Sequence, residues 1–363
     1  MKKSTILLLF LFAAGSLYSQ KPDFIKDSLD AYITQGLQDW QVPGLAIVIV
    51  KNGKIVKMKG YGVLNVVSKK PVTEYSLFLI ASNTKLFTAT ILAQMQYNKK
   101  IKLDDKFTVY FPGFRLYDSN STKLLTKRDL LCHRIGTRSN AGEFAFFNSM
   151  LSRDDVMQRM QYIKPAGSFR QYYGYCNGCF TAAAQVIPKI TGRAWEQYIK
   201  DSILEPLKMT HTYTGLPQLS NAEELATPYT SLYFDTLQRV EYDNDFNLGP
   251  ATTLISSVTD ISHWLMFQLD SGRYNGKQVM NFDILQSTRD INTIISSRRS
   301  SNLPTNFVGY GLGIMVSDYN GRMVYWHTGD ASGMLSNFSI VPQEHLGISV
   351  MCNNDNQNFI AAI

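Results

Sequence analysis

The sequence predicts an α+β fold in which one antiparallel sheet, built from both ends of the chain, is flanked by helices and carries an inserted, mainly helical lobe. β-rich runs at 44–50 and 55–59 are joined through Asn52-Gly53, which is a strong hairpin signal. Short β-type runs return after Gly309, whereas most of the chain between these regions has apolar residues at helical spacing. Strands at both ends with helices between them predict two lobes, with a cleft between the lobes.

The first twenty residues are typical of a secretory signal peptide, so 21–363 are expected to form the domain. Lys2 and Lys3 precede an apolar run over 6–12, and small residues then lead to 19–20, near which cleavage is expected. The run is too short to span a membrane, and no cysteine that could carry a lipid follows it. We therefore expect an exported protein, periplasmic or secreted, with no stable membrane anchor.

The mature chain is large enough for two lobes. We place the sheet lobe at about 21–80 with 305–363, and the helical lobe at about 81–304. The composition, 45% apolar and 18% charged, is that of a globular protein. Without Lys2 and Lys3 the net charge falls from +7 to +5, since 34 basic residues then face 29 acidic ones. This small excess is spread along the chain, so no nucleic-acid partner is expected, and the oligomeric state is left open.

The remaining elements follow in chain order. Four apolar residues at intervals of four predict a helix over 24–40, which Pro43 ends. Further helices are predicted at 126–133, 153–162, 180–190, 194–204 and 258–269. Further strands are predicted at 311–316, 323–327, 335–341 and 347–352, with a hairpin turn at 320–321. A last helical pattern starts after Asn353 and stops at Ile363, so the final helix is expected to be cut short.

The cysteines and histidines give no sign of a metal site. Cys132, Cys176, Cys179 and Cys352 fit neither a disulfide-dense scaffold nor a zinc site. Cys176 and Cys179 have the spacing of a redox motif, and export would permit a disulfide; buried thiols are the favoured interpretation, and the oxidation state is left open. The five histidines are scattered, without metal-ligand spacing. No metal and no cofactor are expected.

The central motif is Ser82-Asn83-Thr84-Lys85, at the start of an apolar helix. Side chains three residues apart share one face of a helix, so Ser82 and Lys85 can touch. A serine hydroxyl becomes a good nucleophile when a neighbouring base removes its proton, and an amine kept neutral by burial can be that base. The pattern is typical of acyl-transferring serine enzymes, although an N-capping serine beside a solvated lysine is the commoner alternative for so short a motif.

Two further motifs support a catalytic interpretation. Tyr175-Cys176-Asn177 lies in a loop before a predicted helix; a tyrosine near a lysine can relay protons, and an asparagine can hold an amide. His327-Thr328-Gly329 lies on a late predicted strand, where the glycine would let a substrate approach the backbone and the histidine would supply a donor.

In this order and separation, the three motifs resemble those of the serine β-lactamase and penicillin-binding protein superfamily. The closest likeness is to its class C-like branch of DD-peptidases, D-aminopeptidases and esterases. Similar blocks stand at 130–136, 205–209, 247–251 and 310–313. The resemblance covers about 24–353 and implies a β-lactamase/transpeptidase-like fold and a covalent acyl-enzyme mechanism on an amide or ester. The implied partner is a small-molecule or peptide substrate, foremost a D-amino-acid-containing peptide such as one derived from peptidoglycan.

The resemblance also implies a role for each residue. Ser82 would be the acylated nucleophile, Lys85 would receive its proton, and Tyr175 would pass a proton to the leaving group and later activate water. The substrate-binding residues would be Asn177, His327, Thr328, Gly329 and Asp330. The backbone N–H groups of Ser82 and Asp330 would form the oxyanion hole.

Some residues depart from the family pattern and cast doubt on a β-lactamase assignment. Asp330 sits where a small or neutral residue is usual. Its carboxylate would destabilise a forming oxyanion unless the side chain points away from the oxyanion. Thr252 and Thr253 stand where the family often has a glycine pair, and Cys176 replaces a serine. Substrate choice is expected to depend on cleft loops such as 140–151 and 219–245.

Several alternatives stay open at this point. The same site would suit an esterase or a β-lactamase. Cys176 has the spacing of a nucleophile elbow, which would make a cysteine hydrolase, and Cys176 with Cys179 would suit a thiol-disulfide protein. A catalytically silent, penicillin-recognising module would keep the fold without needing the proton relay. Arg170 could reach a substrate carboxylate or form a structural ion pair.

Overall fold

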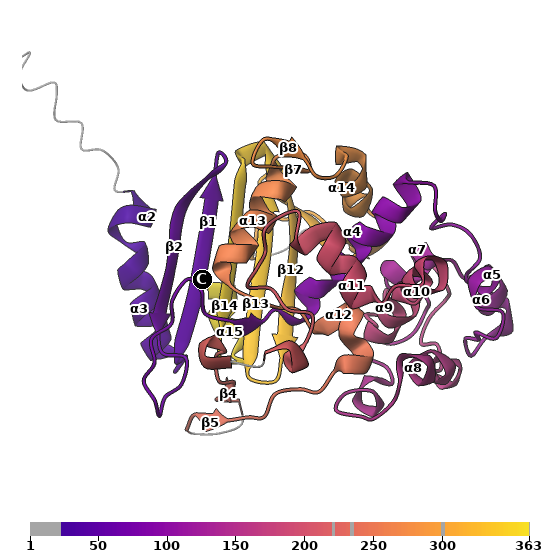
Figure 1. Cartoon of the computed structure of the whole chain (residues 1–363), viewed down its shortest axis with the longest axis horizontal. Helices are drawn as coiled ribbons and strands as arrows, with labels where there is room; N and C mark the ends of the chain where they lie inside the picture. The colour runs from indigo at the N-terminus through magenta and orange to yellow at the C-terminus, as the bar shows by residue number, and fades with distance from the viewer. Residues whose placement is uncertain (1–22, 220–221, 233–235, 299–301, 363) are drawn as a thin grey trace, which may run out of the picture.

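The protein is described by a computed structural model that covers residues 23–219, 222–232, 236–298 and 302–362. The predicted signal peptide at 1–20 lies outside the described residues. Figure 1 shows the central sheet between the N-terminal helices on one side and a group of short helices on the other. No helix among the described residues is long and apolar enough to cross a membrane.

The central sheet has eight strands within the described part of the chain, and neighbouring strands run antiparallel. In spatial order they are β2 (Lys54–Gly62), β1 (Gly44–Lys51), β14 (Leu346–Cys352), β13 (Met334–Val341), β12 (Arg322–Ala331), β11 (Met315–Tyr319), β10 (Val308–Tyr310) and β9 (Thr293–Ser296). Strand β1 pairs with β14, with Leu45 opposite Cys352, so the two ends of the chain meet inside one sheet. The predicted antiparallel sheet from both chain ends is confirmed.

Both predicted Asn-Gly hairpins are present. Asn52 and Gly53 have φ of 53° and 71°, and Asn320 and Gly321 have φ of 50° and 77°. Positive φ at both central residues matches the right-handed twist of the flanking strands, and asparagine and glycine tolerate this conformation best. These two turns set the β1–β2 and β11–β12 pairings.

Strand β1 is buried along both faces. Leu45, Ile47 and Ile49 pack into one apolar cluster together with α3 and α15, whereas Ala46, Val48 and Val50 pack into the larger cluster on the opposite face. Side chains alternate along a strand, so a run of apolar residues without alternation is what a strand covered on both faces requires. The sheet is therefore an inner layer with helices on each side.

The helices of the described residues follow the predicted order. They are α2 (Phe24–Asp27), α3 (Leu29–Asp39), α4 (Thr84–Tyr97), α5 (Phe107–Tyr110), α6 (Ser119–Leu124), α7 (Lys127–Leu131), α8 (Arg153–Arg159), α9 (Asn177–Ala184), α10 (Val186–Thr191), α11 (Trp195–Ile199), α12 (Gly249–Thr252), α13 (Val258–Leu269), α14 (Phe282–Arg289) and α15 (Gln357–Ala362). The predicted helix over 24–40 is interrupted at Ser28 and forms α2 and α3. Ser257 caps α13 by accepting the N–H of Asp260.

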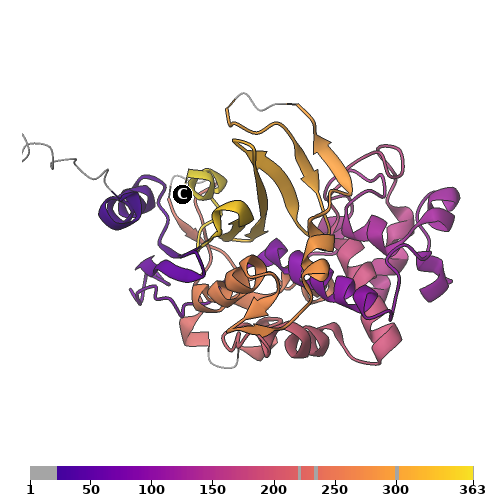
Figure 2. The same cartoon turned by 90° about the horizontal axis from the view of Figure 1, so that it is seen from above.

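Helix α4 is the buried axis between the two lobes. Nearly all of its residues are buried, and it packs against α9, α12 and α14. Figure 2 shows it running between the strands and the helices of the other lobe.

Two-stranded pairs complete the fold: β3 (Phe78–Leu79) with β6 (Ile255–Ser256), β4 (Tyr229–Thr230) with β5 (Gln238–Arg239), and β7 (Arg273–Tyr274) with β8 (Lys277–Gln278).

Two details of the prediction are wrong. The strand expected at 311–316 starts only at Met315, in β11, and 311–314 connect β10 to β11. Gly313 adopts φ +73° in this connection, where a Cβ would lie 2.5 Å from the carbonyl oxygen of Lys85. The expected lobe boundary near 304 is too late, because β9 already belongs to the sheet and α13 packs on β1 and β14.

Candidate active site

The candidate nucleophile Ser82 lies in a short 3₁₀ turn, Ala81–Asn83, which leads directly into α4. The Nζ of Lys85 lies 2.9 Å from Ser82 Oγ, so the predicted contact between the two side chains is present. Ala81 holds a left-handed conformation with φ +45°, an unusual state for alanine that turns the chain sharply just before Ser82. Asn83 Nδ2 donates to Ser336 Oγ at 2.8 Å and ties this turn to β13.

Lys85 is buried completely, with 0% of its surface exposed. Its Nζ also lies 2.5 Å from Asn177 Oδ1 and 3.1 Å from the carbonyl oxygen of Ala251. Burial lowers the pKa of Lys85 to about 7, while the negative charges of Glu143 and Asp245 act in the opposite direction. A large fraction of this lysine is therefore neutral near pH 7 and can accept the proton of Ser82.

Tyr175 faces the same pair of side chains. Lys85 Nζ lies 4.6 Å from the centre of the Tyr175 ring. Burial holds the pKa of Tyr175 well above its ordinary value, and a side-chain hydrogen bond with Ser82 opposes this shift. The phenol is therefore protonated at neutral pH, which suits a group that donates a proton to a leaving group and takes one back from water.

Asn177 is the first residue of α9 and is buried, with 4% of its surface exposed. Its backbone N–H donates to Glu143 Oε1 at 2.7 Å, its Nδ2 donates to Glu143 Oε2 at 2.8 Å, and its Oδ1 accepts from Lys85. We predicted that Asn177 orients the substrate; here it joins Glu143 to Lys85. Glu143 is a member of this site that the sequence did not reveal.

The ring nitrogens of His327 bond to the protein, whereas the sequence predicts that this side chain donates to a substrate. It is 3% exposed, its Nδ1 lies 2.6 Å from the carbonyl oxygen of Thr328, and its Nε2 lies 3.0 Å from the hydroxyl of Tyr310. Burial and the charge of Lys85 lower the pKa of His327 to about 3, so the ring is neutral. A carbonyl only accepts, so Nδ1 carries the proton and Nε2 accepts from Tyr310. Both nitrogens are thus engaged within the protein.

The rest of the His-Thr-Gly segment lies on β12, as predicted. Thr328 is exposed, whereas Gly329 is buried opposite Ser336 of β13. A side chain at Gly329 would lie 2.0 Å from the carbonyl oxygen of Ile80, so the glycine lets β12 approach the turn that carries Ser82. We had expected it to make room for a substrate. Asp330 is exposed, and its Oδ2 accepts from Gln357 Nε2 at 2.8 Å, which draws the carboxylate toward α15.

The alternatives based on other residues find no support in the geometry. Arg170 forms a structural ion pair with the buried Asp129, at 2.9 Å from both Nε and the terminal nitrogen. All four cysteines are free and buried, and Cys176 is 1% exposed. A buried thiol cannot meet a substrate carbonyl, which argues against a cysteine nucleophile. No cluster of potential metal ligands occurs among the described residues.

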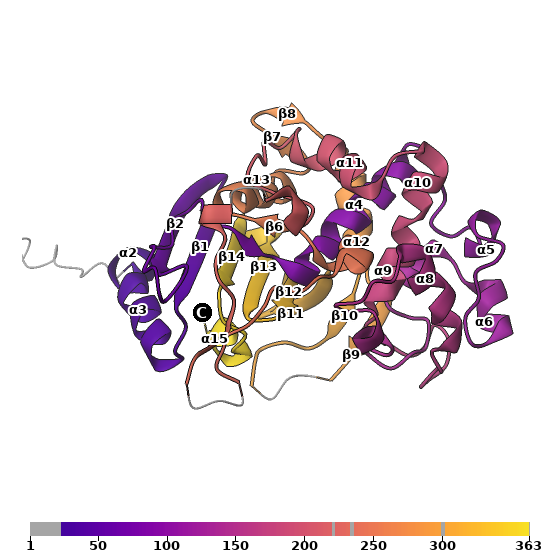
Figure 3. The same ribbon diagram turned by 60° about the horizontal axis from the view of Figure 1, so that its bottom comes forward.

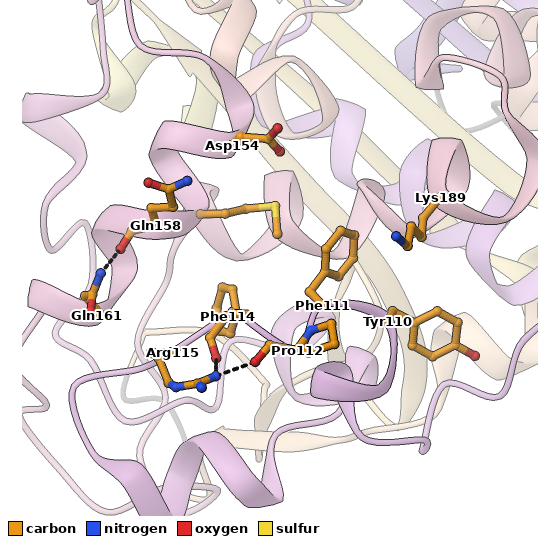
Figure 4. Close-up of a pocket in the computed structure, with 11 residues that line it drawn as sticks. Tyr110, Phe111, Pro112, Phe114, Arg115, Asp154, Gln158, Gln161 and Lys189 are labelled. Atoms are coloured by element: carbon orange, nitrogen blue, oxygen red, sulfur yellow. Dashed lines mark hydrogen bonds between the residues drawn. The ribbon is translucent and has the colours of Figure 1, made fainter.

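A separate groove lies on the helical lobe and is lined by residues of α5, α8, α10 and the loop after α5 (Figure 4). Phe111 and Phe114 form its apolar wall, and Arg115 donates to the carbonyl oxygens of Pro112 and Phe114 at 2.6 and 2.7 Å. The groove shares no residue with the Ser82 site and contains no paired nucleophile and base. The candidate active site is therefore the cleft around Ser82.

The chain is similar to known proteins over most of its length. The model of the family described as Beta-lactamase matches residues 29–362. Protein flp of Staphylococcus aureus (strain N315) is 27% identical over 335 residues, which is 90% of this chain and 63% of that protein. Unguisins hydrolase ungD' of Aspergillus campestris is 27% identical over 342 residues, 88% of this chain and 59% of that protein. The chain thus spans less than two thirds of the length of these relatives.

Among solved structures, the octameric penicillin-binding protein homologue from Pyrococcus abyssi has the same fold. Its TM-score is 0.79 at 22% sequence identity, over 92% of this chain and 74% of that one. The expected β-lactamase/transpeptidase-like fold is thereby confirmed. Because the family model matches residues 29–362, which is most of the chain, the protein belongs to the beta-lactamase family.

Proposed function

We propose that this protein is a serine hydrolase that cleaves an amide or ester through a covalent acyl-enzyme on Ser82. The observation that carries the proposal is the 2.9 Å contact between Ser82 Oγ and the Nζ of Lys85, a fully buried lysine whose pKa is about 7. A lysine in this state is a general base at physiological pH, because its amine is free to take the serine proton.

The steps follow from the contacts around Ser82. As Ser82 Oγ bonds to the substrate carbonyl carbon, its proton passes to Lys85. The oxyanion that forms would accept from the backbone N–H groups of Ser82 and Asp330, each worth about 3 kcal/mol. Tyr175 gives its proton to the leaving group as the bond between carbonyl carbon and leaving group breaks, and it regains a proton from Lys85. Water then attacks the acyl-enzyme by the reverse relay, releasing the acid and restoring Ser82.

The substrate we favour is a D-amino-acid-containing peptide, with a small ester second, and the place of action is outside the cytoplasm. The class C-like motifs and the signal-peptide pattern over 1–20 support these choices. His327 is neutral and Arg170 is already paired with Asp129, so neither of these two side chains offers a free cation to a β-lactam carboxylate. A β-lactam is therefore the least favoured substrate.

The test is intact-mass spectrometry of the purified protein after exposure to a fluorophosphonate and, separately, to a penicillin. We expect the fluorophosphonate adduct on the unmodified chain and on Cys176→Ala, and none on Ser82→Ala. Absence of any adduct on a folded protein would favour a silent binding module. An adduct that remains on Ser82→Ala but is lost on Cys176→Ala would favour the cysteine hydrolase instead.

A further inference from the structure

The Tyr-x-Asn segment of the candidate active site contains a thiol that the proposed mechanism does not use. Cys176 stands between Tyr175 and Asn177 in the sequence, and Cys179 is the third residue of α9, which begins at Asn177. Helix α9 packs against α4, α8 and α12, and Figure 3 shows it next to α8 and α12. A change in the bonding of Cys176 therefore acts on the backbone between two residues of the Ser82 site.

The thiols of Cys176 and Cys179 lie within reach of each other. Cys176 is the N-cap residue of α9, three positions before Cys179. Helix geometry places Cα atoms three residues apart at about 5 Å, inside the range of about 4.4–6.8 Å that a disulfide spans. A side-chain hydrogen bond links the two thiols. The fold thus holds them as neighbours that can be joined by a covalent bond.

The other two cysteines have separate partners. Cys132 Sγ lies 3.9 Å from the carbonyl oxygen of Asp129, and Cys352 Sγ lies 3.3 Å from that of Asn354. Each of these two thiols is thus directed at a backbone acceptor. A disulfide in this protein is therefore expected between Cys176 and Cys179, and Cys352 provides a matched control for a buried thiol outside the pair.

The backbone from Tyr175 to Asn177 is held by three side chains of the preceding loop. The consecutive N–H groups donate to Ser139 Oγ at 3.0 Å, to His133 Nδ1 at 3.1 Å and to Glu143 Oε1 at 2.7 Å. Because every one of these N–H groups is engaged, the segment cannot shift without lengthening at least one of the three bonds.

Closing the disulfide would force such a shift. Cβ atoms three residues apart on a helix are about 5–6 Å apart, whereas a disulfide holds them at about 3.5–4.5 Å. Cys176 and Cys179 therefore have to approach each other by roughly 1 Å. Cys176 moves more easily, because it lies at the end of α9 with extended backbone angles, φ −149° and ψ 111°. Its movement displaces Tyr175 and Asn177 from their positions beside Lys85.

Folding protects the thiol pair from reagents. Cys176 is 1% exposed and Cys179 is 0% exposed, and burial raises the pKa of the Cys179 thiol well above its ordinary value. Thiol-disulfide exchange needs a thiolate that the oxidant can reach. Oxidation is therefore slow in the folded protein and proceeds while the chain is still unfolded, so the folded protein keeps the state in which it folded.

We propose that Cys176 and Cys179 form a disulfide when the chain folds in the presence of a low-molecular-weight disulfide, and that this bond lowers the activity of the Ser82 site. One cysteine thiolate attacks the oxidant and forms a mixed disulfide. The second cysteine displaces the remaining small thiol, so the new Sγ–Sγ bond forms as each cysteine loses one hydrogen and both halves of the oxidant are reduced to thiols. The inference rests on the proposed hydrolase function and on the proposed location outside the cytoplasm, where such oxidants occur.

The test refolds the purified protein from urea in two samples, one with oxidised glutathione and one with a reductant, and compares the second-order rates of fluorophosphonate labelling. We expect the oxidised sample to lack two hydrogens, with the loss in the tryptic peptide 171–189, which contains both Cys176 and Cys179. It should label Ser82 about tenfold to a hundredfold more slowly, the range that a displacement of about 1 Å produces. Refolding it with a reductant should restore the faster rate.

Two variants separate this disulfide from other effects of oxidation. Cys179→Ala should label at the same rate after either treatment, whereas Cys352→Ala should keep the difference between the two samples. If the disulfide is absent from the oxidised sample, or if it forms and the labelling rate stays the same, the inference is wrong and the hydrolase proposal stands. If the reduced sample is not labelled on Ser82, the hydrolase proposal fails first and this inference with it.

Discussion

Both carboxylate oxygens of Glu143 accept hydrogen bonds from Asn177: Oε1 from its backbone N–H and Oε2 from its side-chain Nδ2. These two bonds fix the orientation of the Asn177 amide, since Nδ2 must face the carboxylate and Oδ1 must face Lys85. Glu143 also supplies a negative charge that raises the pKa of Lys85. A residue that need not touch the substrate thus sets both the position and the charge of the candidate base.

Glu143→Gln should lower the rate of Ser82 acylation by about tenfold to a hundredfold. The glutamine amide presents a donor to one of the two donors of Asn177, and leaving a buried donor unsatisfied costs about 1–3 kcal/mol. The measurement is the second-order rate of fluorophosphonate labelling. Glu205→Gln, at an exposed position, is the control. Equal labelling rates for Glu143→Gln and the unmodified protein would mean that Glu143 does not position the site.

The pH dependence of kcat/KM for a neutral ester should show a rising limb with an apparent pKa near 7. Lys85 reacts as the neutral amine, and its pKa is lowered to about 7, so activity is low below this pH and reaches a plateau above it. Glu143→Gln removes a charge that raises the Lys85 pKa, so the remaining activity should have its limb at lower pH. A limb near 10.5, the pKa of an ordinary lysine, would contradict this assignment.

Gly329→Ala should impair activity more than stability. The added methyl group would lie 2.0 Å from the Ile80 carbonyl oxygen, so β12 and the turn that carries Ser82 must move apart. Such overpacking costs about 1–3 kcal/mol of folding free energy, and the shift displaces Ser82 from Asp330 on β12. We would measure kcat/KM together with urea unfolding. Gly113→Ala is the control: a methyl group there meets nothing within 4 Å, so kcat/KM and stability should both stay unchanged. Unchanged activity in Gly329→Ala would show that the close approach of β12 to the Ser82 turn is dispensable.

Asp129→Ala should destabilise the fold by about 3 kcal/mol, because Arg134 and Arg170 lose a fully buried partner. Burial raises the pKa of Asp129, but the hydrogen bonds from Arg170 and Arg134 outweigh this and lower it overall. Its contribution is therefore present above the unfolded-state pKa of 3.8 and is lost as the pH falls through the lower folded-state pKa. Urea unfolding at pH 7 measures the loss.

The control for this change is Asp104→Ala, which breaks an ion pair whose carboxylate is largely exposed, and it should cost under about 1 kcal/mol. Equal losses of unfolding free energy in the two variants would mean that burial does not make the ion pairs of Asp129 more stabilising than the exposed pair of Asp104. Acid titration of the unmodified chain and of Asp129→Ala should show their stabilities converging as the pH falls, whereas a constant difference down to pH 2 would contradict the assigned pKa direction.

The sequence by itself determined the features that depend on near neighbours in the chain. Ser82 meets Lys85 because residues three apart share a helix face, and Asn52-Gly53 and Asn320-Gly321 turn because asparagine and glycine tolerate positive φ. The order of Ser82, Tyr175 and His327 was enough for the family resemblance, and the family match and the solved structure agree with it.

Only the tertiary structure decided which distant groups share a bond. Glu143 stood in a loop expected to shape the cleft, but nothing local tied it to Asn177, and Arg170 found Asp129 rather than a substrate. The hydrogen bond between His327 Nε2 and the Tyr310 hydroxyl likewise joins two different strands, β12 and β10. Spacing fixes which side chains share a face, whereas burial, pairing and pKa depend on what the fold packs against that face.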